Sequence, residues 1–120
     1  MTSVSEGART TSGATTIAYS LGPVEALPIG EGVTFVVGGR QIAVFRLRSG
    51  VVRAIAAICS HRGGPLADGQ ADEASVICPL HAHVFDLATG VCRTGQPAVT
   101  AYPVRVDDAG CVVVELPEDD

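Results

Sequence analysis

Two short motifs, Cys59-Ser60-His61 and Cys78-Pro79-Leu80-His81, decide how the rest of this chain is interpreted. The stretch from Arg62 to Ile77 separates them. Each motif supplies one thiol and one imidazole, and both groups bind transition metals. If the two motifs lie on loops that face each other, the two sulfurs can hold one metal ion and the two ring nitrogens a second.

This division of ligands is that of a Rieske [2Fe–2S] centre, in which one iron has thiolate ligands and the other has imidazole ligands. The chain resembles the Rieske iron–sulfur proteins, and the likeness covers residues from near Val24 to Leu116. It includes the stretches Gly63 to Gly69, Phe85 to Gly90 and Tyr102 to Val106. Within the family the chain is most like the small subunit of NADH-dependent assimilatory nitrite reductase, and next like the ferredoxins of dioxygenases.

The resemblance implies that Cys59 and Cys78 bind the inner iron of one [2Fe–2S] cluster, and that His61 and His81 bind the outer iron. The alternative for the same four residues is a structural zinc site in a small interaction domain, because two Cys and two His also form zinc sites. Zinc fingers, however, pair cysteine with cysteine and histidine with histidine in each short motif. Here each motif contains one of each, which favours the iron–sulfur centre.

The composition indicates one all-β domain. The chain has 120 residues, of which 47% are hydrophobic and 18% are charged, and it contains 14 Gly and 7 Pro. Many valines between glycines and prolines are typical of short strands and tight turns. The formal net charge of −5 argues against a nucleic-acid partner, which requires clustered Lys and Arg.

The expected fold is a Rieske-type antiparallel β-sandwich or barrel with a small cluster-binding subdomain of loops. We expect residues 1–15 to be a flexible tail, residues 16–116 to be one domain with its cluster-binding part at about 59–97, and residues 117–120 to be an acidic end. No signal peptide and no apolar run long enough for a bilayer is evident. The sequence therefore predicts a cytoplasmic protein with no membrane partner.

Alternating or apolar runs bounded by turn residues predict the strands. They lie at Thr16–Leu21, Val33–Val37, Gln41–Leu47, Val51–Ile58, Ser75–Cys78, Val84–Leu87, Val91–Cys92, Val99–Val106 and Cys111–Leu116. Gly38-Gly39 between the second and third runs is typical of a two-residue hairpin turn.

Three further residues and one loop also lead to predictions. His83 follows His81 by two residues, and we expect a polar residue at the rim of the cluster rather than a third ligand. Cys92 and Cys111 lie in apolar runs and are expected to be buried free thiols. The resemblance implies that the loop Thr94 to Pro97 covers the cluster; a plain connecting loop is the alternative.

Several enzyme activities are excluded. With His61 and His81 assigned to the cluster, only His83 remains, so the chain cannot form the two-histidine, one-carboxylate iron site of an oxygenase. Gly30-Glu31-Gly32 lacks the third glycine of a dinucleotide-binding motif. The chain is therefore predicted to be an electron carrier or an accessory subunit, and not an enzyme.

Two functions remain open. The first is a ferredoxin that passes single electrons from a reductase to a terminal oxygenase. The second is a fixed small subunit bound to the large subunit of NADH-dependent nitrite reductase. The resemblance would place the two additional cysteines of high-potential members at Gly64 and Leu80, and these are absent. We therefore expect a potential in the lower half of the Rieske range of about −150 to +300 mV.

Overall fold

The structure is a computed structural model that describes residues 5–11, 14–58, 65–79 and 82–117, with side chains from residue 16 onward. Three antiparallel sheets account for the described strands, and two short 3-10 helices, η1 (Val24–Ala26) and η2 (Leu66–Asp68), connect them. The all-β prediction is confirmed. No helix in the described part of the chain has the length and apolar character needed to cross a bilayer.

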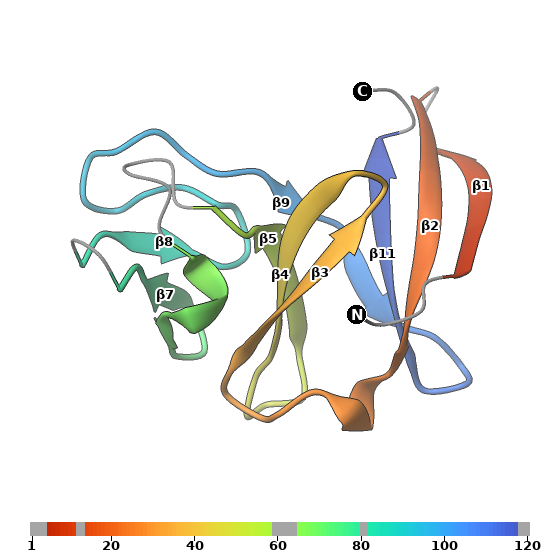
Figure 1. Ribbon diagram of the computed structural model, residues 1–120, viewed down its shortest axis with the longest axis horizontal. Helices are drawn as coiled ribbons and strands as arrows, with labels where there is room; N and C mark the ends of the chain where they lie inside the picture. The colour runs from red at the N-terminus through yellow and green to blue at the C-terminus, as the bar shows by residue number, and fades with distance from the viewer. Residues whose placement is uncertain (1–4, 12–13, 59–64, 80–81, 118–120) are drawn as a thin grey trace.

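The first sheet joins the two ends of the chain (Figure 1). Its strand order is β1-β2-β11-β10. The strands are β1 (Ser5–Thr11), β2 (Ala14–Pro23), β11 (Cys111–Pro117) and β10 (Val104–Val106). Because β2 and β11 pair along most of their length, the beginning and the end of the domain hold each other in place.

The second sheet lies in the middle of the molecule (Figure 1) and has the order β3-β4-β5-β9. Its strands are β3 (Gly32–Val37), β4 (Arg40–Arg46), β5 (Val52–Ala56) and β9 (Ala101–Tyr102). Gly38 and Gly39 connect β3 to β4 with φ angles of 56° and 80°. Positive φ at both central residues is what a primed two-residue turn requires, so the predicted hairpin is confirmed.

The central strand β4 of the middle sheet is buried on both faces. Successive side chains of a strand point to opposite sides, and β4 shows this plainly. Ile42 and Val44 belong to a buried cluster with Leu116 of the first sheet. Ala43 and Phe45 belong to a second buried cluster with the third sheet. The molecule is thus layered, with one hydrophobic core on each side of the middle sheet.

The third sheet is small and lies at the left in Figure 1. It contains β6 (Gln70–Ala71), β7 (Ser75–Ile77) and β8 (Val84–Asp86), in that order. Strands this short bury little surface of their own, and Val76 and Phe85 pack with Phe45 of the middle sheet instead. The second motif lies in the connection from β7 to β8, and the first lies between β5 and η2.

Three expectations about elements differ from the structure. The structure describes Ser5–Thr11, which the sequence assigned to a flexible tail, as strand β1; it pairs with β2 through the backbone, and such pairing does not need a hydrophobic pattern. The single strand Val99–Val106 is wrong because Pro103 separates β9 from β10, which belong to different sheets. The run Val91–Cys92 forms only one bridge, between Cys92 and Phe85.

Candidate functional site

Of the four predicted ligands, the structure describes Cys78. Cys78 follows directly after β7 and forms no disulfide bond. It is 2% exposed and lies in the same buried cluster as Val76 and Phe85. Cys59, His61 and His81 lie outside the described residues, and their role as ligands stays a prediction. A buried thiol at the end of a strand fits the inner, cysteine-bound iron of a Rieske cluster.

The residues on either side of the first motif are held together. Ile58 and Pro65 form an antiparallel bridge, and the amide of Leu66 donates to the carbonyl of Ala57 over 2.7 Å. Ala57 and Leu66 are 3% and 0% exposed and pack in the cluster that contains Cys78. The two ends of the segment that contains Cys59 and His61 therefore lie side by side, next to the core that includes Cys78.

The second motif lies in a loop closed by two backbone hydrogen bonds. The amide of Cys78 donates to the carbonyl of His83 over 2.8 Å, and the amide of Ala82 donates to the carbonyl of Cys78 over 3.0 Å. Ala82 has a φ of 59°, which residues with a Cβ rarely adopt. Such strain persists where the surrounding structure fixes the backbone, and it is concentrated at functional sites.

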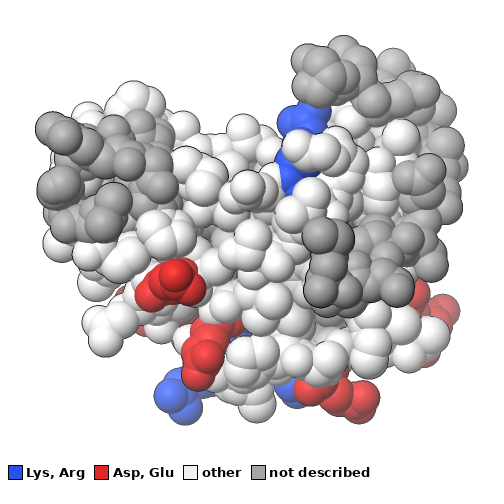
Figure 2. All heavy atoms as spheres, in the orientation of Figure 1, with Lys and Arg blue, Asp and Glu red and all other residues white. Residues whose placement is uncertain are grey.

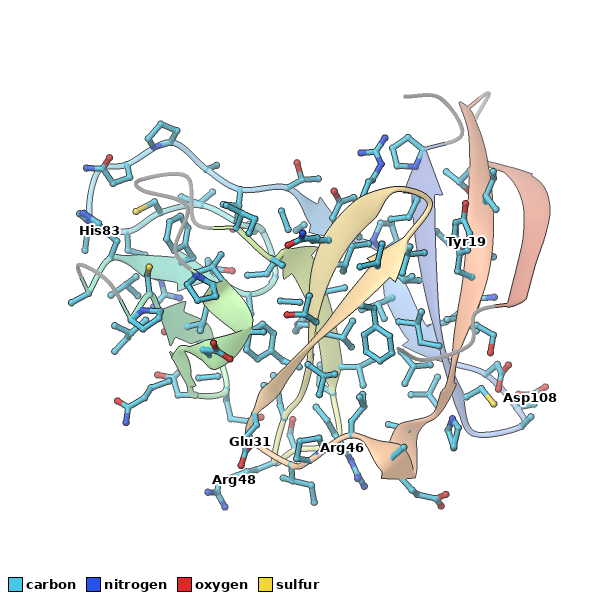
Figure 3. All side chains as sticks on the ribbon, viewed as in Figure 1. Tyr19, Glu31, Arg46, Arg48, His83 and Asp108 are labelled. Carbon is cyan, nitrogen blue, oxygen red and sulfur yellow. The ribbon has the colours of Figure 1, made fainter. Side chains whose placement is uncertain are left out.

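His83 is held by the loop that follows β8. Its Nδ1 lies 2.7 Å from the hydroxyl oxygen of Thr94, which also accepts the amide of Val84 over 3.3 Å and lies 3.2 Å from the sulfur of Cys92. Figure 3 shows His83 at the left-hand end of the molecule. The sequence identified the loop Thr94 to Pro97 but not the contact of Thr94 with His83. A hydroxyl two residues after a cysteine is too common a pattern to indicate such a contact.

Cys92 is a buried free thiol, as predicted, whereas Cys111 is only half-buried beside an irregularity in β11. Burial raises the pKa of the Cys92 thiol. Hydrogen bonds from the Thr94 hydroxyl and from the backbone amides of Thr94, Gln96 and Gly95 outweigh this effect and leave the pKa below its ordinary value. The sulfur of Cys92 is therefore part of the hydrogen bonding that shapes this loop.

Two aspartates fix the turns of the small sheet. Asp72 accepts the amides of Ala74 and Ser75 over 2.8 and 2.7 Å, and these bonds hold the pKa of its carboxyl below the ordinary value. Asp86 accepts Nη2 of Arg93 over 2.8 Å, and this contact lowers the pKa of its carboxyl. The turns on both sides of the second motif thus depend on ionised carboxylates.

Comparison with known families indicates the cofactor. The model of the Rieske [2Fe-2S] domain matches residues 18–113 of this chain. The chain belongs to the Rieske family. The family match shows one Rieske-type [2Fe–2S] cluster, and the buried thiol of Cys78 is consistent with it.

Relatives of this Rieske protein include small ferredoxins. The 3-phenylpropionate/cinnamic acid dioxygenase ferredoxin subunit of Escherichia coli strain K12 is 37% identical over 99 residues, which are 80% of this chain and 91% of the relative. A solved ferredoxin of Sphingomonas yanoikuyae B1 is 31% identical, with a TM-score of 0.71, covering 82% of this chain and 97% of that chain. Both relatives are named as ferredoxins, which are electron carriers.

A solved protein from Mycobacterium tuberculosis, described as an NADH-dependent nitrite reductase small subunit, has the same fold. Its TM-score is 0.81 at 27% identity, and the match covers 87% of this chain and 98% of that one. The agreement in fold confirms the Rieske β-sandwich expected from the sequence.

Proposed function

We propose that this Rieske protein is a diffusible ferredoxin that takes one electron from a reductase and delivers it to a terminal oxygenase. The observation that supports this best is its likeness to dioxygenase ferredoxin subunits over 80% of this chain and 91% of theirs. In this proposal the protein carries electrons and leaves the oxidation of substrate to its partner.

The proposed ligands are Cys59 and Cys78 for one iron and His61 and His81 for the other. The bound cluster supplies reversible one-electron chemistry. The chain itself keeps Cys78 away from water in an apolar cluster and closes the loop that contains His81. Neutral imidazole ligands raise the potential relative to four thiolates, but the missing extra cysteines favour the lower half of the Rieske range.

The surroundings of His83 favour contact with a partner at this end. Ala82, Thr94 and Pro97 are exposed and uncharged. On the face shown in Figure 2, acidic side chains lie in the lower half, and Figure 3 labels Glu31 near the bottom and Asp108 at the right, away from His83. Uncharged side chains such as these are desolvated at lower cost than charged ones when a partner binds. We also propose that the protein works in a reducing cytoplasm, in keeping with its free Cys78, Cys92 and Cys111.

A second candidate is a fixed small subunit of nitrite reductase. The TM-score of 0.81 with the Mycobacterium tuberculosis protein favours it. In this case the protein would stay bound to a large reductase subunit instead of diffusing between partners.

Reconstituted turnover distinguishes the two. Purified holoprotein is added to a ferredoxin-dependent dioxygenase and its reductase, and substrate oxidation is measured against protein concentration. A ferredoxin supports saturable turnover, and Cys78→Ser, which removes a proposed ligand, abolishes it. No turnover with any dioxygenase tested, together with stoichiometric co-purification with a large reductase subunit from native cells, would overturn the ferredoxin proposal in favour of the subunit.

A further inference from the structure

The hydroxyl of Thr94 makes three contacts at one point. It lies 2.7 Å from Nδ1 of His83, accepts the amide of Val84 over 3.3 Å and lies 3.2 Å from the sulfur of Cys92. A hydroxyl has one donor and two acceptor positions. With the Val84 amide accepted, it can donate to one of His83 and Cys92 and accept from the other, so all three contacts can form at once.

These contacts join two loops that are separate in the sequence. His83 closes the loop of the second motif through its carbonyl, which accepts the amide of Cys78. Cys92 lies opposite Phe85 of β8 and begins the loop that runs to Pro97. The amide of Arg93 donates to the carbonyl of Val84 over 2.7 Å, and Thr94 adds a side-chain contact to His83.

We propose that Thr94 is a positioning residue for electron transfer, whose hydroxyl fixes the backbone of the second motif through His83 and Val84. This inference rests on the proposed function, because it requires the proposed ligand His81, two residues before His83. Thr94 does not touch a ligand itself. Its hydroxyl contacts His83 and Val84, which follow Ala82, and at Ala82 the backbone is in an unfavourable conformation that needs support from its surroundings.

Thr94→Val removes the hydroxyl and keeps the shape of the side chain, whereas Thr94→Ser keeps the hydroxyl. Thr89→Val is the matched control, because the Thr89 hydroxyl accepts the amide of Val91 over 3.2 Å in the turn that follows β8. For each holoprotein we would measure the visible circular dichroism of the cluster, its reduction potential, and the rate at which a chelator bleaches it in native buffer.

The proposal predicts that Thr94→Val bleaches about 5 to 30 times faster than the wild type and changes the dichroism and the potential, since a polar contact that fixes the loop is lost. Thr94→Ser should bleach within about twofold of the wild-type rate and keep the wild-type dichroism and potential. Thr89→Val should leave all three quantities unchanged. Equal impairment of Thr94→Ser and Thr94→Val, or no effect of either, would overturn the inference.

His83→Phe provides a second route if Thr94→Val does not fold. It removes the imidazole partner of Thr94 and leaves the hydroxyl with Val84 and Cys92, so faster bleaching is again expected. If His83→Phe bleaches at the wild-type rate, the contact has no positioning role. A wild-type protein that contains no iron–sulfur cluster would instead refute the proposed function, and this outcome is visible before any variant is made.

Discussion

The two cores on either side of the middle sheet are built differently. The core towards the first sheet draws its residues mainly from paired strands, among them Phe35, Val44, Val114 and Leu116. The core towards the small sheet depends on strands of two or three residues, and it includes the small side chains Ala43 and Ala57 and the thiols of Cys78 and Cys92. The first is stabilised by apolar packing, whereas the second also needs hydrogen-bonded turns and, in our account, the metal cluster.

Replacing one phenylalanine in each core gives the largest expected effect. Phe45 is 0% exposed in the core of the small sheet, and Phe35 is 5% exposed in the other core. Truncation of either to alanine should lower the free energy of unfolding by about 3–5 kcal/mol, measured by urea denaturation. Only Phe45→Ala should also release the cluster faster in native buffer. Equal cluster loss in both variants would show that the two cores are not independent.

Removal of the cluster should give the next largest difference between the two regions. Metal sites that form only in the folded state contribute their binding free energy to folding. In apoprotein, amide exchange at Asp86, which donates to Val91, should become roughly 100-fold faster or more. Exchange at Glu115, which donates to Pro103 in the first sheet, should change little. Hydrogen-exchange mass spectrometry measures both, and uniform acceleration along the chain would contradict the comparison.

Acid should affect the small sheet first. The pKa of Asp86 is lowered from 3.8 mainly by its bond with Arg93, so its contribution is present above pH 3.8 and is lost as the pH falls through the lower folded value. Asp86→Asn should therefore reduce the slope of unfolding free energy against pH in this acid range. Comparison with the wild type cancels the acid sensitivity of the cluster itself. An unchanged slope would mean that this carboxylate does not stabilise the turn.

The smallest effect is expected at Ala82. Its φ of 59° costs a residue with a Cβ more than it costs glycine, so Ala82→Gly should stabilise the holoprotein by about 0.5–1 kcal/mol. Ala88→Gly, in the exposed turn after β8, is the control and should be neutral or slightly destabilising. Thermal unfolding of both variants tests this, and destabilisation by Ala82→Gly would argue against the left-handed backbone.

The sequence predicted the parts of this molecule that depend on local chemistry. Gly38 and Gly39 marked the hairpin because a primed turn requires positive φ, and the motifs with Cys59 and Cys78 indicated the family because their spacing is specific. The break at Pro103 was missed, although proline lacks an amide, because the apolar alternation continues through it. The contacts of Thr94 could not be predicted, since they join residues brought together only when β8 pairs with the following loop.

The central claim is that Cys78 is a ligand of a Rieske cluster. Metal and sulfide analysis, together with electron paramagnetic resonance of the reduced protein, tests it most directly. Our account predicts two iron and two sulfide per chain, a one-electron signal on reduction and the loss of both in Cys78→Ser, while Cys111→Ser retains them. A colourless protein that contains one zinc ion and no sulfide, or a Cys78→Ser variant with an unchanged signal, would contradict it.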